Sequence, residues 1–190
     1  ETETGMRRRL LRALERVTAR AATVVTANSR SLADAATREG LAARADILVP
    51  GAGSATGIDL ERFASGADLP PLDPATAAFV ETGDTVVGFV GRVTPDKGVA
   101  TLLAALEALV DEGRAIRLLM LGRIESAPVR ALVDAAAGRL PVLRLDHVDD
   151  PRAHLAAIDL LCLPSRREGF PTVVLETAAF GIPTVTTDAT

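Results

Sequence analysis

Short apolar runs alternate with helical patterns along the second half of the chain. The predicted strands are 85–91, 115–121, 141–145, 159–163 and 183–186, and the predicted helices between them are 98–112, 126–137, 151–157 and 171–180. Nearly continuous apolar strands separated by helices are typical of a parallel sheet that is covered on both faces. The pattern therefore predicts an α/β fold with a doubly wound, Rossmann-like sheet.

The first part of the chain has a less regular pattern. Residues 7–22 predict a helix with its apolar residues on one face, and residues 23–26 predict a short buried strand. Ser29 and Gly40 fit the two caps of a second helix, and 47–49 fit another short strand. These elements precede a stretch of different composition.

Gly, Ser, Ala, Asp and Pro dominate residues 51–74, as expected of a linker. The predicted division is therefore residues 1–66 for the tail of a first domain with its linker, and residues 67–190 for the Rossmann-like domain. The chain stops directly after a predicted strand.

Composition narrows the classes of function. Apolar residues make up 48% and charged residues 24% of the 190 residues, the balance of a globular protein. Aromatic residues make up 3% and the net charge is −4, which disfavours nucleic-acid binding. The single cysteine, Cys162, and the two histidines offer no zinc-ligand spacing and no intrachain disulfide. No apolar stretch suits a membrane span or a secretion signal, so the predicted location is cytoplasmic.

Arginine is concentrated in the first predicted helix. Six arginines lie between Arg7 and Arg20, against the single acid Glu15. This helix could contact anionic lipid headgroups at the inner face of the plasma membrane, or it could be an ordinary solvated surface.

The loop 91–98 follows the first predicted strand of the sheet and leads into a helix. Arg92 and Lys97 flank this turn, and the free N–H groups at a helix start attract anions. The segment therefore suits a diphosphate, although solvated loop charges would give the same pattern.

The loop after strand 159–163 carries two glutamates around a helix start. Pro171 fits the first helical position and leaves the amides of Thr172 and Val173 available to an anion. Glu168 precedes this helix and Glu176 lies inside it, so hydroxyl groups on both sides of a bound phosphate could each meet a carboxylate. A nucleotide sugar has that arrangement. The alternative is that Glu168 complements the helix dipole and Glu176 is solvated.

Three segments together resemble the retaining glycosyltransferases of family four, the group 1 class with the GT-B fold. They are the loop 91–98, the stretch 149–165, and the paired glutamates Glu168 and Glu176 with seven residues between them. Segments 51–63 and 165–171 are similar to the bacterial branch that builds capsule, exopolysaccharide and O-antigen.

The resemblance implies a role for each matching residue. Arg92 and Lys97 would hold the donor diphosphate, Glu168 would meet the donor sugar, and Glu176 would bind the ribose. Glu168, Arg92 and Lys97 are the implied catalytic residues. The remaining donor contacts implied are Val148 beside the base and the backbone of Gly169, Phe170, Thr172 and Val173.

The implied activity is transfer of a hexose or N-acetylhexosamine, with retention, from a UDP-sugar to a lipid-linked or saccharide acceptor. The departing diphosphate would assist deprotonation of the acceptor, without a metal or other cofactor. The acceptor domain of the family extends before the position of Glu1, and its closing helices extend beyond the position of Thr190. The resemblance therefore implies that the first part of the chain is the tail of the acceptor domain, that the donor domain is incomplete at its C-terminus, and that this chain is inactive alone. Two alternatives remain, a nucleotide-sugar 2-epimerase of the same fold and a non-catalytic nucleotide-binding fragment.

Overall fold

The computed structural model describes residues 5–53, 57–64, 66 and 68–189, which form two compact units. The first unit contains the chain up to Gly57 together with Gly169–Pro171, and the second contains Ile58–Glu168 and Thr172–Ala189. Residues 58–64 and 66 thus belong to the second unit, whereas the predicted division placed them with the linker. The division into an acceptor-domain tail and a donor domain stays a prediction.

The first unit contains two helices and a pair of short strands. Its elements are α1 (Met6–Ala21), β1 (Val25–Thr26), α2 (Arg30–Arg38), the 3-10 helix η1 (Arg44–Asp46) and β2 (Ile47–Leu48). The strands β1 and β2 are parallel, with Val25 opposite Ile47. The Ser29 hydroxyl accepts a hydrogen bond from the amide of Leu32 at 3.1 Å and caps α2, as its position predicts.

Exposure in the first unit differs from the sequence prediction. Among the residues that the structure describes, α1 has no buried member, and Val24 in the segment predicted as a buried strand is 61% exposed. The buried core of this unit is small and consists of Ala27, Ala33 and Ile47. A strand forms at Val25–Thr26 within the predicted segment 23–26, but the prediction that this segment is buried is wrong, because periodicity shows which residues are apolar but not whether another element covers them.

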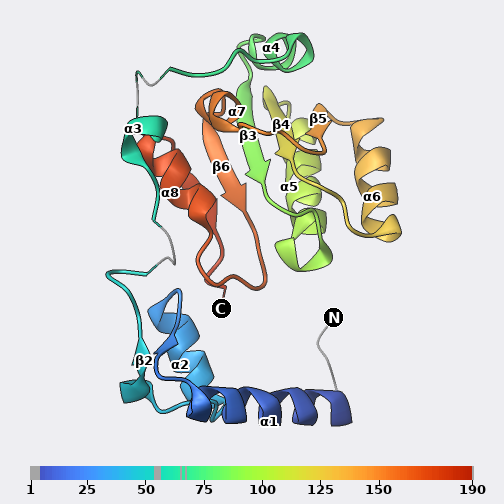
Figure 1. Cartoon of the computed structure of the whole chain (residues 1–190). Helices are drawn as coiled ribbons and strands as arrows, with labels where there is room; N and C mark the ends of the chain where they lie inside the picture. The colour runs from blue at the N-terminus through green and yellow to red at the C-terminus, as the bar shows by residue number, and fades with distance from the viewer. Residues whose placement is uncertain (1–4, 54–56, 65, 67, 190) are drawn as a thin grey trace. The chain divides into compact units, whose positions relative to one another are not determined.

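The second unit contains a five-stranded parallel sheet in the order β5-β4-β3-β6-β7. The strands are β3 (Thr85–Val90), β4 (Ile116–Leu121), β5 (Val142–Leu145), β6 (Leu160–Leu163) and β7 (Thr184–Thr186). In Figure 1 the arrowheads of β3, β4 and β6 point in the same direction, as parallel pairing requires. The predicted α/β class and the parallel Rossmann-like sheet are confirmed.

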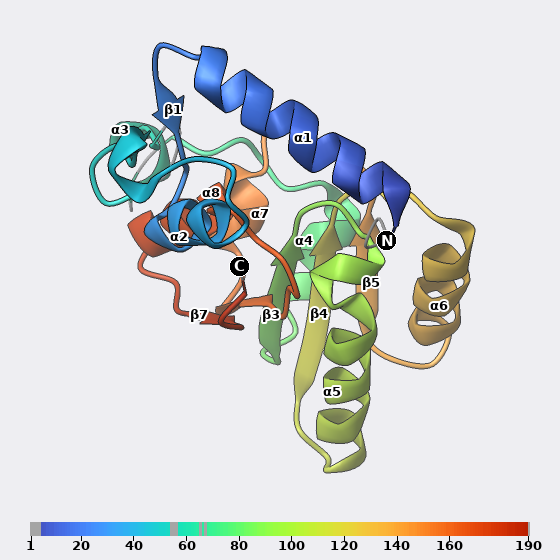
Figure 2. The same cartoon turned by 90° about the horizontal axis from the view of Figure 1, so that it is seen from below.

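Helices cover both faces of this sheet. They are α3 (Leu60–Phe63), α4 (Pro74–Val80), the 3-10 helix η2 (Pro95–Lys97), α5 (Val99–Asp111), α6 (Ala127–Ala137), α7 (Arg152–Ala156) and α8 (Thr172–Ala179). The helix α5 packs on β4 and α6 on β5, while α8 packs with α3, α7 and β7. Figure 2 shows α5 and α6 on one side of the sheet and α8 on the other. Right-handed crossovers produce this arrangement when the strand order reverses beside β3.

The apolar runs of the sequence form the core of the second unit. Phe89, Leu118 and Met120 are fully buried, and Leu155 and Leu161 pack with them. Cys162 packs against the same core and is half-buried, as expected of an apolar strand residue. Burial raises the pKa of its thiol, which leaves it largely protonated at neutral pH.

The segment predicted as a linker carries structure after residue 57. The helix α3 forms there, and the ring of Phe63 meets that of Phe180 edge to face at 5.9 Å between centroids. The guanidinium of Arg152 donates to the carbonyl oxygens of Arg62 at 3.3 Å and Asp68 at 3.1 Å. The sequence did not predict this helix, because a helix of one turn has no periodicity and is stabilised by contacts distant in sequence; the linker role of the stretch stays a prediction.

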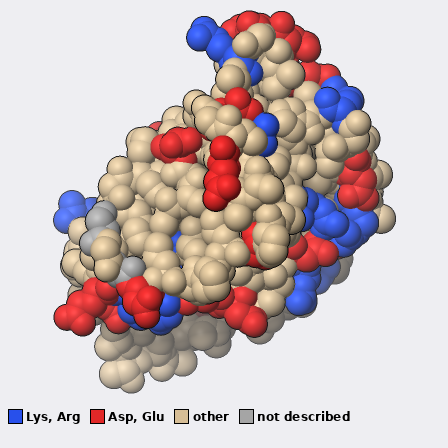
Figure 3. Space-filling model, turned by 90° about the horizontal axis from the view of Figure 1, so that it is seen from above, with Lys and Arg blue, Asp and Glu red and all other residues tan. Residues whose placement is uncertain are grey.

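Charged side chains of both signs are interspersed over the face drawn in Figure 3. Nucleic-acid-binding surfaces gather positive charge on one face. The distribution on this face has no such concentration.

Candidate functional site

The loop after β3, which carries Lys97, and the loop after β6, which carries Glu168, leave the sheet from neighbouring strands. Since β3 pairs with β6, with Val87 opposite Leu160, the loops after these strands start from the same edge of the sheet. The strands β4 and β5 lie on the other side of β3, so the order reverses between β3 and β6. Ligands of doubly wound sheets bind in the crevice at such a reversal.

Backbone contacts hold these two loops together. Gly98 has φ 70° and ψ 22°, and a Cβ atom built on it would lie 1.9 Å from the carbonyl oxygen of Pro164. The amide of Arg166 donates to the carbonyl oxygen of Asp96 at 2.7 Å. Only glycine fits at position 98, both for its backbone conformation and for the space available.

The predicted residues Lys97 and Glu168 meet between the loops. The Nζ atom of Lys97 lies 2.6 Å from Oε1 of Glu168, and their side chains are only 17% and 16% exposed. The hydroxyl of Ser165 donates to the same oxygen at 2.7 Å. The structure thus brings a cation and a carboxylate from distant parts of the sequence into one partly buried pair.

Arg92 has a different partner. Its Nη1 atom lies 3.1 Å from Oε2 of Glu125, in the loop after β4, and the Arg92 side chain is 63% exposed. An exposed pair of this kind is weak and can exchange for another anion. A diphosphate role for Arg92 therefore requires it to leave Glu125, and it stays a prediction.

Arg92 and Val148 line one pocket at the carboxyl ends of β3, β4 and β5. Its volume is about 300 Å³, and its other lining residues are Val90, Gly91, Leu121, Gly122, Arg123, Asp146, His147 and Pro151. Sequence reasoning placed Val148 near a base but missed Gly122 and Arg123. The sequence does contain a pattern that could have indicated Gly122 and Arg123, because a Gly-Arg pair follows β4 just as Gly91-Arg92 follows β3.

The glycines of these two Gly-Arg pairs shape the floor of the pocket. Gly91 and Gly122 both have φ 148°, and a Cβ atom on Gly122 would lie 1.8 Å from the carbonyl oxygen of Gly91. The two strand ends approach so closely that no side chain fits between them.

The helix α8 carries the remaining predicted residues of the second unit. Its first N–H groups, at Thr172 and Val173, lie where a helix has no acceptors of its own. The side chain of Val173 is buried in the core, so only its backbone is available to a ligand. Gly169 and Phe170, also predicted to line the donor through their backbone, belong to the first unit and are not part of this geometry.

Glu176 lies in α8 and is half-buried. Burial raises the pKa of its carboxyl group, and within residues 5–53, 57–64, 66 and 68–189 the side chain makes no hydrogen bond or ion pair. A half-buried carboxylate without a hydrogen-bond donor carries a desolvation penalty, which a ligand that donates a hydrogen bond would reduce. Its position suits the hydroxyl groups of a ligand.

Several arginines of α1 form ion pairs or hydrogen bonds with other residues of the first unit. Arg8 and Arg12 pair with Glu39, and Arg16 donates to the carbonyl oxygens of Gly40 at 2.8 Å and Glu39 at 3.1 Å. These contacts reduce the positive charge that the helix presents. The sequence alone did not show that Glu39 lies against it.

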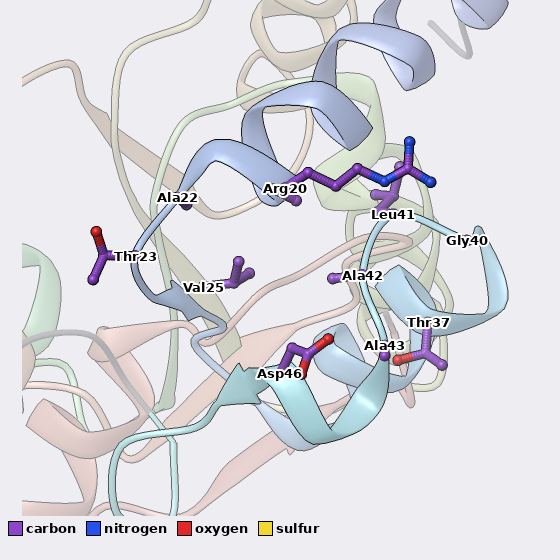
Figure 4. A pocket seen from close by; sticks show the side chains of 11 residues that line it. Arg20, Ala22, Thr23, Val25, Thr37, Gly40, Leu41, Ala42, Ala43 and Asp46 are labelled. Carbon is purple, nitrogen blue, oxygen red and sulfur yellow. The ribbon is translucent and has the colours of Figure 1, made fainter.

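The first unit also has an open pocket of about 720 Å³ between the end of α1 and the segment after α2. Arg20 extends from the helix on one side and Asp46 lies on the other, as Figure 4 shows. None of the predicted site residues lines it.

The described residues contain neither a candidate metal site nor a candidate membrane-spanning helix. Over the described residues, His, Cys, Asp and Glu form no group of three or more that could hold a metal ion. In the same part of the chain, no helix has both the length and the apolar character needed to cross a bilayer.

Comparison with known proteins identifies the family. Residues 84–190 match the model of the "Glycosyl transferases group 1" family. The chain is 30% identical over 192 aligned residues to the capsular polysaccharide biosynthesis glycosyltransferase CapM of Staphylococcus aureus. This alignment covers 100% of this chain and 50% of that protein. The chain is 32% identical over 104 residues to the putative teichuronic acid biosynthesis glycosyltransferase TuaC of Bacillus subtilis, covering 53% of this chain and 24% of that protein.

Solved structures agree with this assignment of the fold. The chain superposes on Anabaena Alr3699/HepE in complex with UDP-glucose with a TM-score of 0.74 and 22% identity, over 94% of this chain and 49% of that one. It also superposes on WaaG, a glycosyltransferase involved in lipopolysaccharide biosynthesis, with a TM-score of 0.62 and 22% identity, over 86% and 44% of the two chains. The chain thus spans about half the length of these glycosyltransferases and carries one half of their GT-B fold. With its parallel sheet, its joined loops after β3 and β6 and the matching family model, this chain belongs to the group 1 glycosyltransferases.

Proposed function

We propose that the protein transfers a hexose or N-acetylhexosamine from a UDP-sugar to a lipid-linked or saccharide acceptor, with retention, in the synthesis of bacterial surface polysaccharide. The observation that carries this proposal is the meeting of Lys97 and Glu168, 2.6 Å apart, where the strand order reverses. A relative named for capsule synthesis and a structural neighbour holding UDP-glucose support it.

The proposed site divides the donor among three elements. Lys97 and Arg92 hold the diphosphate, and the start of α8 at Thr172 and Val173 adds its free amides. Glu168 accepts from hydroxyls of the sugar and Glu176 from those of the ribose. The base enters the pocket that contains Val148. The implied backbone role of Gly169 and Phe170 stays a prediction, since both residues belong to the first unit.

The chemical step is proposed to depend on stabilising the leaving group. When the bond from sugar to diphosphate breaks, negative charge grows on the diphosphate, and fixed cations and helix amides favour that charge. Lys97 is proposed to supply most of this effect because the loop contacts at Gly98 and Asp96 hold its backbone. The nucleotide sugar is itself the substrate, and the proposal includes no metal or other cofactor.

Acceptor recognition is proposed to need more than this chain. Since the chain covers 50% of CapM, the matching enzyme has as much sequence again. We propose that the first unit belongs to an acceptor-binding domain and that transfer requires that domain in full.

Isothermal titration with UDP, GDP and ADP tests the donor site. We expect UDP to bind with a Kd tighter than those of GDP and ADP, and Lys97→Ala to weaken it at least tenfold, because a charge-assisted contact to phosphate is worth about 1.5–3 kcal/mol. Arg114→Ala is a matched control, because it removes an exposed cation in the turn between α5 and β4, at the far end of the strands. If UDP does not bind, or if both variants bind it as the unaltered chain does, the proposed donor site is wrong.

We also propose peripheral contact of α1 with the inner face of the plasma membrane. Leu10 is 60%, Leu14 55% and Val17 63% exposed on this arginine-rich helix. Exposed apolar residues with basic neighbours suit an anionic lipid surface. Sedimentation with phosphatidylglycerol vesicles should be lost when Leu10 and Leu14 are changed to Ser, and phosphatidylcholine vesicles should sediment little protein. Equal sedimentation of both proteins with both lipids would contradict this proposal.

A further inference from the structure

The contacts of Glu168 are concentrated on one of its two oxygen atoms. Oε1 lies 2.6 Å from Nζ of Lys97 and 2.7 Å from the hydroxyl of Ser165. Within the described chain, Oε2 of Glu168 accepts no hydrogen bond. One oxygen is thus fixed by two donors and the other is available.

The two donors differ in how firmly they are held. Ser165 is 1% exposed, and its backbone carbonyl oxygen accepts a hydrogen bond from the Thr187 hydroxyl. The next amide, that of Arg166, donates to the carbonyl oxygen of Asp96 at 2.7 Å. A serine hydroxyl turns about a single side-chain bond, whereas the ammonium of Lys97 sits on a flexible four-carbon stem. Ser165 is therefore the more rigid of the two donors.

A bound diphosphate would compete for one donor and leave the other in place. Lys97 is the only cation within 4.0 Å of Glu168 among the described residues, and the proposed function assigns the same ammonium to the diphosphate. Phosphate oxygens attract that ammonium more strongly than a single carboxylate does because they carry more charge. The hydroxyl of Ser165 has no such competitor.

We propose that Ser165 is a positioning residue, which holds Oε1 of Glu168 so that Oε2 is presented to a hydroxyl of the donor sugar while Lys97 turns to the diphosphate. This inference rests on the proposed function, since it needs a ligand with both a diphosphate and a sugar. Ser165 does not touch the ligand in this arrangement and acts through Glu168.

A purely structural role for Ser165 predicts a different result. A buried hydroxyl needs a partner for the stability of the fold, whatever the ligand. Loss of such a role would lower the stability of the chain and weaken every ligand by the same factor. Loss of positioning would weaken only ligands that carry a sugar.

Titration of UDP and UDP-glucose into the unaltered chain, Ser165→Ala and Ser165→Thr separates these roles. In Ser165→Ala, we expect the Kd for UDP to stay within about twofold and the Kd for UDP-glucose to rise at least about tenfold, the value of one hydrogen bond to a charged group. Ser165→Thr keeps a hydroxyl and should restore most of the affinity for UDP-glucose. Urea unfolding of each protein shows that the chain is folded during titration.

A double-mutant cycle keeps the test decisive even if the extra methyl of threonine does not fit. Glu168→Ala should raise the Kd for UDP-glucose, and adding Ser165→Ala to it should raise that Kd no further, because the acceptor of the Ser165 hydroxyl is already absent. Equal effects on UDP and UDP-glucose, no effect on either, or additive effects in the cycle would overturn the positioning role. Failure of the unaltered chain to bind UDP would instead contradict the proposed function, and the inference would fall with it.

Discussion

Gly98 and Pro164 are in closer contact than any other residue would allow at position 98, since a Cβ atom there would lie 1.9 Å from the Pro164 carbonyl oxygen. This contact joins the loop that carries Lys97 to the loop that carries Glu168. The backbone contact therefore sets the spacing of the two loops.

Gly98→Ala should therefore separate the two loops. Gly113→Ala is a matched control, because Gly113 has φ 77° against 70° for Gly98 but has nothing within 4 Å of its Cβ position. We expect the control to lose only the cost of left-handed backbone, about 1–2 kcal/mol. Gly98→Ala should lose more in urea unfolding and should also lose UDP affinity. Equal free energies of unfolding and equal UDP affinities in the two variants would show that the contact between positions 98 and 164 can relax without affecting the fold or the site.

Glu176→Gln should weaken UDP binding without weakening the fold. The pKa of Glu176 is raised by burial, so its ionised form costs folding free energy at neutral pH and this cost disappears as the pH falls. Replacing it by Gln should leave the free energy of unfolding unchanged or slightly higher. The loss of charge-assisted hydrogen bonds to ribose should raise the Kd for UDP about tenfold.

The same raised pKa predicts how UDP affinity depends on pH. Protonation of Glu176 should begin above the usual value of 4.5 and should weaken UDP binding as the pH falls. The phosphate also titrates, so the informative quantity is the difference between the unaltered chain and Glu176→Gln, which should shrink toward low pH. A difference that is constant with pH would contradict the ribose role.

Glu125 should act as a competitor for Arg92. The exposed pair between them, 3.1 Å apart, is worth at most about 1 kcal/mol. Glu125→Gln should release Arg92 toward the diphosphate and tighten UDP binding about two- to fivefold at low salt. The gain should vanish in the double variant Arg92→Ala with Glu125→Gln. A gain that persists there would mean that Glu125 acts by general repulsion of the anion.

Asp73 should stabilise α4 in a pH-dependent way. Its carboxylate accepts hydrogen bonds from the amides of Ala75 at 3.1 Å and Thr76 at 3.0 Å and from the Thr76 hydroxyl at 2.5 Å. The Thr76 hydroxyl has the largest part in lowering the pKa of Asp73. The stabilisation is therefore present above the unfolded pKa of about 3.9 and is lost as the pH falls below it.

Urea unfolding of Asp73→Ala measures this effect. At pH 7 the loss should be about 1 kcal/mol, the usual value of a helix cap, and it should shrink as the pH falls below about 4. Asp73→Asn keeps a capping oxygen without a charge, so its difference from Asp73→Ala should change little with pH. UDP affinity should be unchanged in both variants.

The sequence predicted the sheet well because each strand is a buried apolar run between turn residues. The predicted strands 85–91 and 115–121 differ from β3 and β4 by one residue each. The alternation of helix and strand was enough to place the loops after β3 and β6 at one edge. Periodicity could not reveal α3, which is a single turn held by Arg152 and Phe180.

The candidate site was only partly predictable from sequence. The predicted residues Lys97 and Glu168 meet, although no local pattern indicated that they would pair directly. Ser165 lies in the segments 149–165 and 165–171, but the sequence did not indicate a role for it, because a hydroxyl buried against a carboxylate is recognisable only in three dimensions. The pairing of Arg92 with Glu125 depends on two loops whose relative position the sequence does not encode locally.

The strand order has a consequence for how specificity could change in evolution. The pocket proposed for the base is built from residues 90–151, at the ends of β3, β4 and β5, whereas Glu168 and Glu176 follow β6. The part proposed to recognise the base and the part proposed to recognise the sugar and ribose are therefore consecutive stretches of sequence. On the proposed assignment, a single recombination between α7 and β6 would join the base preference of one homologue to the sugar preference of another. We expect such a chimera with a homologue of different donor preference to keep the base selectivity of its first parent, which titration with UDP and GDP would measure.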